Sequence, residues 1–246
     1  MGTERPEGGN AASGAEQRWE ARALEGLAAF DAGRIDDAYA AWRSAAAMTG
    51  AFDADDPRRA ASRTHLALCR AAGGDTEAAR RAFRRALRAW EAAEAWVARM
   101  TIPQRARSSG FHLRLEAKHP GGYDAIARAE FARLLGAGRA AALAGCAHLA
   151  RDPMAALEGS LALRAAGLGR RDAGQALIMR AIATCRQKAG DEQGAQDARQ
   201  RAQEIERDPV HFGPERLAAT AGALRAGDLR RLKAAVYLTP VCLRRR

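Results

Sequence analysis

Residues 75–100 read DTEAARRAFRRALRAWEAAEAWVARM, and the spacing within this stretch indicates how the chain is built. Its apolar residues recur every three or four positions, which places them on one stripe of a long α-helix. The other faces of that helix are dense in arginine. The sequence therefore predicts a helix with one buried seam and one strongly positive surface. The seam consists of Ala79, Phe83, Ala86, Trp90, Ala93, Val97 and Met100.

The residues just before this helix indicate a tight turn. Residues 71–75 read AAGGD, and a glycine followed by an aspartate ends one helix and caps the next. Helices predicted over residues 19–32 and 35–48 flank Gly33 in the same way. Pro57 then begins another helix, because proline is well tolerated in a first turn. The repeating unit predicted here is a helical hairpin.

The first two hairpins share one pattern around the turn glycine. Small residues let two antiparallel helices approach closely, and one bulky residue fills the space towards the next hairpin. This pattern resembles the tetratricopeptide repeat (TPR) family over about residues 19–93, and partially afterwards. The pattern is read at the positions seven and three residues before the turn glycine and five, nine and twelve residues after it. Around Gly33 these positions hold Gly26, Phe30, Ala38, Trp42 and Ala45. Around Gly74 they hold Ala67, Ala71, Ala79, Phe83 and Ala86.

The resemblance implies an all-α, right-handed solenoid of about six antiparallel hairpins, a TPR-like superhelix over residues 18–239. Turns are expected near positions 33, 74, 122, 151, 190 and 227, and the match weakens at Gly190, which places Arg199 where a bulky apolar residue belongs. Residues 1–17 lack apolar periodicity, so we expect a disordered leader there. Residues 240–246 are expected to form a basic tail.

The composition limits the classes of function. Lys+Arg 40 against Asp+Glu 29 gives a net charge of +11, which attracts nucleic acid, anionic lipid or acidic protein. A GC-rich genome would produce the same arginine and alanine excess. The four cysteines are far apart and form no C-x-x-C pair, so we expect reduced thiols and no cofactor. Without a signal peptide or a long apolar run, we expect a cytoplasmic protein.

A polar stripe is predicted on the helix after Pro103. Successive members are separated by four, three, four and three residues, so they share one face of the helix. They are Arg105, Ser109, His112, Glu116 and His119. The stripe could be a solvated face, part of a recognition groove, or a metal or catalytic site, since the spacing of its histidines and glutamate suits metal ligation. Pro120 disfavours helical geometry at His119 and weakens the metal interpretation.

The TPR resemblance also implies that peptide ligands lie against the first helix of each hairpin. That face presents Glu20, Ala23, Leu27 and Phe30 in the first hairpin, then Thr64 and Leu68 in the second. It lacks the lysine and asparagine clamp for C-terminal carboxylates. An apolar groove favours a partner helix or extended segment bound by burial. We therefore predict a non-enzymatic protein–protein interaction module, an adaptor or scaffold, with Arg105, Ser109, His112 and Glu116 continuing the groove.

The arginine surface supports a different class of function. Arg80, Arg81, Arg84, Arg85 and Arg88 could neutralise several phosphates, which predicts a basic nucleic-acid-binding or regulatory helical protein as the alternative. No stacking aromatic is interleaved with them, because the aromatics of this helix belong to its seam. An enzyme that uses the His112 and Glu116 face ranks third.

Overall fold

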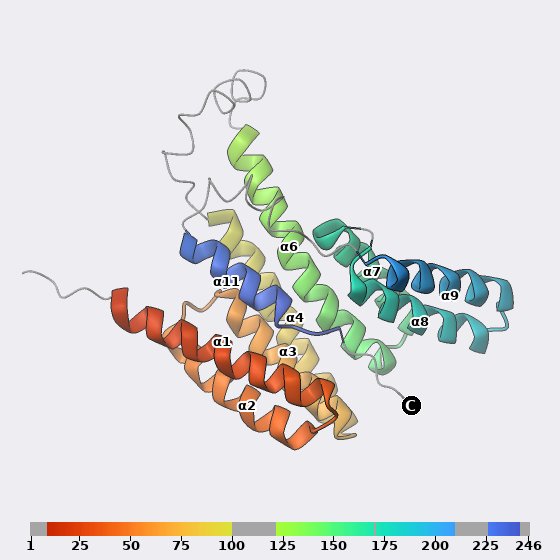
Figure 1. The fold of residues 1–246 in the computed structure, drawn as a ribbon, viewed down its shortest axis with the longest axis horizontal. Helices are drawn as coiled ribbons and strands as arrows, with labels where there is room; N and C mark the ends of the chain where they lie inside the picture. Colours follow the sequence, from red (N-terminus) through yellow and green to blue (C-terminus); the bar gives the residue numbers. More distant parts are fainter. Residues whose placement is uncertain (1–8, 100–121, 170, 210–225, 242–246) are drawn as a thin grey trace, which may run out of the picture.

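The computed structural model describes residues 9–99, 122–169, 171–209 and 226–241, and the regular elements within these ranges are all helical. The all-α class predicted from the sequence is therefore confirmed for this part of the chain. The helices are α1 (Gly9–Asp31), α2 (Ile35–Met48), α3 (Pro57–Ala72), α4 (Thr76–Arg99), α6 (Gly122–Cys146), α7 (Pro153–Leu168), α8 (Ala173–Lys188), α9 (Glu192–Arg207) and α11 (Ala226–Tyr237) (Figure 1).

Helices that follow one another in the sequence pack in pairs, α1 with α2, α3 with α4, α6 with α7, and α8 with α9. The pairs also pack in series through α2 on α3, α4 on α6 and α7 on α8. Helix α11 departs from this order, because it skips α7, α8 and α9 and packs against α3 and α6 (Figure 1). The hairpin of α8 and α9 extends away from the other helices.

Glycines with positive φ form the tight turns, as the sequence predicts at three positions. Gly33, Gly74 and Gly190 have φ values of 75°, 83° and 82°. A side chain at such a φ clashes with the backbone, so these turns favour glycine. The turn predicted near position 151 also lies between two helices, because α7 begins at Pro153 with the Asp152 side chain as its N-cap. Gly227 lies instead in the first turn of α11.

The seam of α4 is buried, as its spacing predicts. Ala79, Phe83, Ala86, Trp90, Ala93 and Val97 are each at most 1% exposed. Met100, the last predicted member of the seam, lies outside the described residues. The spacing of apolar residues in this stretch therefore identified the face that joins the core.

Bulky aromatics pack against glycines of neighbouring helices. The indole of Trp42 on α2 lies where a Cβ at Gly26 on α1 would project, and the indole of Trp90 on α4 does the same at Gly138 on α6. Each indole is fully buried and donates a hydrogen bond, from Trp42 Nε1 to the Ala23 carbonyl (3.0 Å) and from Trp90 Nε1 to Thr64 Oγ1 (3.1 Å). These contacts set the close approach of α1 to α2 and of α4 to α6.

Helix α1 begins earlier than the composition predicts. It starts at Gly9, within the stretch expected to be a leader. Ala15 is buried in the main core, and the Glu16 carboxylate forms ion pairs with Arg58 and Arg231. These tertiary contacts stabilise a turn of helix that has little apolar periodicity of its own.

The buried apolar residues of the described ranges form two main cores and a small cluster of Ala176, Ala202 and Ile205. The larger one includes residues of α1, α2, α3, α4, α6 and α11, whereas the smaller one joins the far side of α6 to α7, α8 and α9. Val241, which follows α11, packs into the smaller core beside Leu157 and Ile178. The C-terminal segment therefore contacts both cores.

Candidate functional site

Helix α11 lies on the face formed by the first helices of successive hairpins, α1, α3 and α6, where the sequence predicts a binding groove (Figure 1). Its apolar side is Leu232, Ala235 and Val236, each at most 1% exposed and part of the main core. Residues three and four apart share one side of a helix, so this is the usual pattern of a helix seated in an apolar groove. The candidate site is this seat, which we call the α11 groove.

His65 lies beneath the end of α11. Its Nε2 is 2.7 Å from the Leu238 carbonyl oxygen, which can only accept, so the neutral ring donates from Nε2. The ring stacks on Trp42 with centroids 4.5 Å apart, and its Nδ1 is buried without a hydrogen-bond partner in the described structure. Burial lowers the pKa of His65 to about 4, against a smaller opposing effect of the Leu238 carbonyl. The imidazole is therefore neutral at physiological pH.

A network of ion pairs links the other end of α11 to α1 and α3. Asp56 caps α3, accepting a hydrogen bond from the Arg58 amide and a bidentate pair from the Arg58 guanidinium at 2.9 and 2.7 Å. Arg58 is 2% exposed and also lies 3.7 Å from the centre of the Phe52 ring. Glu16 of α1 then joins Arg58 to Arg231 of α11, at 3.2 and 3.0 Å. Three helices are thus linked by one network.

A hollow of about 730 Å³ remains where this face ends, beside residues 240–241. It brings together Phe30 and Leu68, two residues that the sequence assigns to the groove. Leu177 of α8, which is 39% exposed, also lines it. Phe30 and Leu68 therefore lie together at this hollow, next to the part of the face on which α11 packs.

The other predicted groove residues have mixed surroundings. Ala23 and Thr64 are fully buried, and the Thr64 hydroxyl is used internally, because it accepts from Trp90 and donates to the Ala60 carbonyl. Leu27 and Glu20 are half-buried. Leu27 and Glu20 therefore keep part of their surface exposed, whereas Ala23 and Thr64 belong to the interior.

The polar stripe of Arg105, Ser109, His112, Glu116 and His119 lies outside the described residues. The metal and catalytic interpretations of that stripe therefore stay predictions. Within the described ranges, no three His, Cys, Asp or Glu side chains gather as a metal site would need. No helix there is long and apolar enough to cross a membrane.

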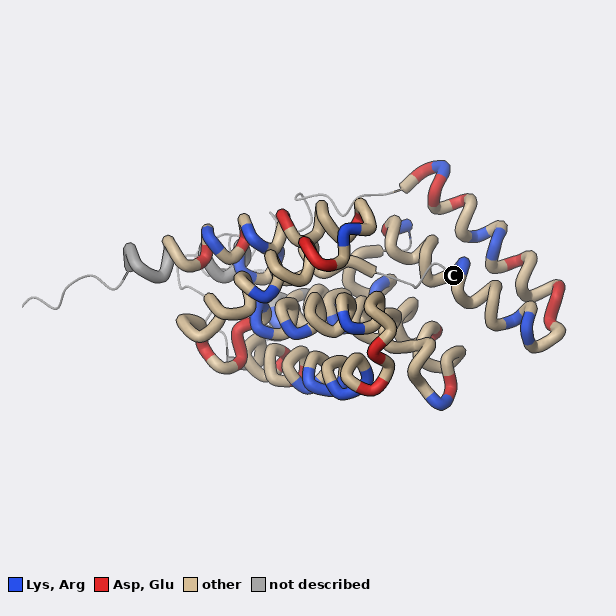
Figure 2. Tube along the Cα trace, turned by 90° about the horizontal axis from the view of Figure 1, so that it is seen from below, with Lys and Arg blue, Asp and Glu red and all other residues tan. Residues whose placement is uncertain are grey.

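The predicted basic face is divided by its contacts. Arg80 pairs with Glu77 and reaches the Leu149 carbonyl, whereas Arg81, Arg84, Arg85 and Arg88 are exposed. Figure 2 marks the basic and acidic positions along the chain, and the α8 and α9 hairpin that projects to the right carries both colours. On α4, by contrast, the stretch between Glu77 and Glu91 contains five arginines and no acidic residue.

Sequence reasoning missed three features of these surfaces. Nothing local indicated that His65 would contact Leu238, or that Arg58 would be linked through Glu16 to Arg231. Arg63 and Arg70 of α3 were also overlooked, although they line a cleft with the predicted Arg85 and Arg88. Their seven-residue spacing is a usable signal, because it places both on one side of α3.

Comparison with known proteins adds little to this geometry. No protein-family model matches the chain, and no curated protein matches it. A solved structure entitled MamA MSR-1 C2 aligns with 77% of this chain and 97% of its own, at 16% sequence identity and a TM-score of 0.24. A likeness of this size carries no argument about fold or function.

Proposed function

We propose that this chain is a non-enzymatic protein-interaction module, an adaptor or scaffold, whose α11 groove binds a helical segment of a partner. The observation that carries the proposal is the seating of α11 itself. A helix from a distant part of the sequence buries Leu232, Ala235 and Val236 against α3 and α6. A face that binds one amphipathic helix through an apolar stripe has the shape and chemistry to bind another.

The hairpins supply the scaffold for this activity. We propose that they continue as a TPR-like right-handed solenoid, supported by the small-and-bulky packing of Trp42 on Gly26 and by the turn glycines Gly33 and Gly74. In such a stack the first helices line one side, which is where α11 lies. The partner segment would then take the place of α11 or extend beyond it into the hollow beside Phe30 and Leu68.

Covalent attachment gives α11 an advantage over any partner. A tethered segment commonly has an effective concentration on the order of millimolar, so a partner must bind the open groove tightly enough to overcome it. The module would therefore bind weakly while α11 is seated and more strongly once it is released. This predicts that weakening α11 strengthens partner binding.

The test is affinity capture from the native cell extract with three versions of the full chain. The first is the wild type, and the second carries Leu232→Asp and Val236→Asp, which remove the apolar anchors of α11. The third carries Leu24→Asp and Ala162→Asp, which add the same two charges at exposed positions outside the α11 groove and its hollow. We expect the second version to capture more of a specific partner, and a synthetic peptide of residues 226–241 to displace it. Equal capture by all three, or capture that the peptide does not reduce, would contradict the proposal.

A further inference from the structure

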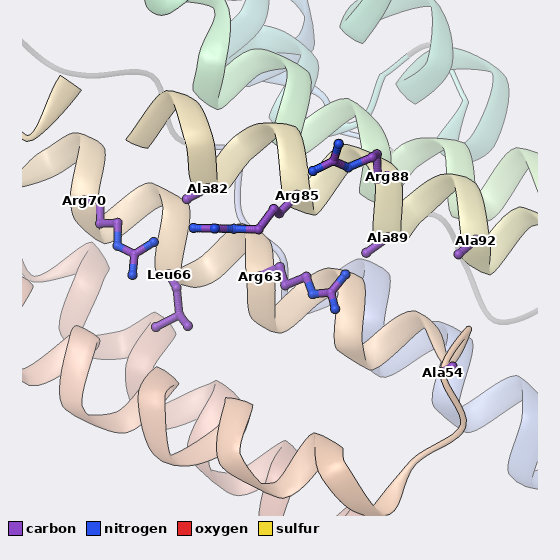
Figure 3. A pocket seen from close by; sticks show the side chains of 9 residues that line it. All are labelled: Ala54, Arg63, Leu66, Arg70, Ala82, Arg85, Arg88, Ala89 and Ala92. Atoms are coloured by element: carbon purple, nitrogen blue, oxygen red, sulfur yellow. The ribbon is translucent and has the colours of Figure 1, made fainter. Parts of the chain in front are cut away.

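A second hollow lies on the other side of α3, away from α11. It is a cleft of about 470 Å³ between α3 and α4, floored in part by Leu66, Ala82 and Ala89. Four arginines line it, Arg63 and Arg70 from α3 and Arg85 and Arg88 from α4 (Figure 3). We call this surface the arginine cleft.

The cleft is independent of the α11 groove because it uses the opposite side of α3. Arg63, Leu66 and Arg70 are three and four residues apart and share one side of the helix. His65 and Leu68, which face the groove and its hollow, lie on the other side. A ligand in the cleft would therefore leave α11 in place.

The four arginines have no anionic partner among the described residues. None of the nine described residues that line the cleft is acidic. No ion pair or hydrogen bond to a described residue is made by these four guanidinium groups, whereas Arg139 nearby pairs with Glu91 and Glu94. Like charges held close together raise the free energy of the unliganded protein, and a bound anion relieves that cost.

The walls and spacing indicate what kind of anion fits. Arg63 and Arg70 are seven residues apart on one helix, or about 10 Å along its axis. Carboxylates at positions i, i+4 and i+7 of a partner helix span the same distance. Arginine forks bind carboxylates bidentately, and the alanine and leucine floor can pack against the methylene groups of glutamate.

Nucleic acid fits the cleft less well. Binding of single strands relies on aromatic side chains on which bases stack. No aromatic residue is among the described residues that line the cleft, and Phe83 and Trp90, the neighbouring aromatics of α4, are buried in the core. The described lining thus offers charge and an apolar floor without a stacking surface.

We infer that the arginine cleft is a binding site for an acidic helical segment of a protein partner, with carboxylates on Arg63, Arg70, Arg85 and Arg88. Exposed charge pairs are each weak, so affinity would come from several pairs made at once on a prearranged surface. The site would also accelerate the encounter with an acidic partner.

The test measures fluorescence anisotropy of labelled probes with the full chain. The main probe is an alanine-based helical peptide with glutamates at i, i+4, i+7 and i+11, and its control has glutamines at those positions. A labelled single-stranded DNA of equal charge is the third probe. The cleft variant is Arg70→Gln with Arg85→Gln, and its matched control is Arg81→Gln with Arg84→Gln, which removes the same charge from α4 outside the cleft.

We expect the glutamate peptide to bind the wild type, the glutamine peptide to bind at least about tenfold more weakly, and the cleft variant to lose about tenfold in affinity. The control variant should lose much less. Equal losses in both variants would show a general positive field in place of a site and would overturn the inference. The inference would also be overturned if the DNA bound more tightly than the peptide and the cleft variant lost affinity for the DNA. Absence of peptide binding at millimolar concentration would overturn it as well. Unchanged circular dichroism of both variants confirms that folding is not the cause.

Discussion

The seating of α11 predicts a large cost for a single truncation, Leu232→Ala. Leu232 is fully buried in the core formed with α3 and α6. The change removes three carbon groups, each worth about 0.8 kcal/mol of transfer free energy, or about 2.4 kcal/mol together. The cavity left behind adds to this, and buried Leu→Ala changes typically cost about 2–5 kcal/mol. We therefore expect a destabilisation of about 3 kcal/mol.

The assay is urea unfolding followed by circular dichroism, with Leu24→Ala as the matched control. Leu24 of α1 is 53% exposed, so the same chemical change there should alter the free energy of unfolding by less than about 0.5 kcal/mol. If α11 detaches before the hairpins unfold, the loss will instead appear in amide hydrogen exchange of α11 alone. A Leu232→Ala variant that matches the Leu24→Ala variant in both measurements would refute the seating of α11.

Two further predictions concern His65 and Gly138. Because the folded-state pKa of His65 is about 4 and its ordinary value is 6.5, its neutral form stabilises the fold above pH 6.5, and that stability is lost as the pH falls towards 4. The loss is about 3 kcal/mol. The free energy of unfolding of a His65→Gln variant should therefore fall less steeply in acid than that of the wild type. If the two free energies fell in parallel with pH, this effect of His65 would be excluded. Gly138→Ala should destabilise the fold by about 1–2 kcal/mol in thermal unfolding, because its Cβ meets the Trp90 indole, whereas Gly159→Ala, in open space on α7, should stabilise it slightly. A neutral Gly138→Ala would contradict the packing of α4 on α6.

Local features of the fold follow directly from the sequence. The apolar spacing of residues 79–97 identified the buried side of α4, and the glycines at 33, 74 and 190 marked turns with positive φ. Each of these depends on residues within one or two helical turns of one another. Helical periodicity and the conformational freedom of glycine are properties of short stretches, so a single sequence reveals them.

The candidate site depends on contacts that short stretches do not encode. His65 and Leu238 are 173 residues apart, and Glu16 and Arg231 are 215 apart. The spacing of Leu232 and Val236 shows that α11 has an apolar side, but several apolar faces could have received it. The start of α1 at Gly9 was missed for the same reason, because its stabilising ion pairs come from α3 and α11.

The most direct test of the proposed function is to supply α11 in trans. A labelled peptide of residues 226–241 would be titrated with the full-length wild type and with the Leu232→Asp, Val236→Asp variant, and its anisotropy recorded. Because the resident helix no longer competes, the variant should bind the peptide at least about tenfold more tightly than the wild type. A Leu232→Ala, Val236→Ala chain should fall between the two, and a peptide carrying the aspartates should not bind. Equal affinity of all three chains for the unmodified peptide would contradict a helix-binding groove.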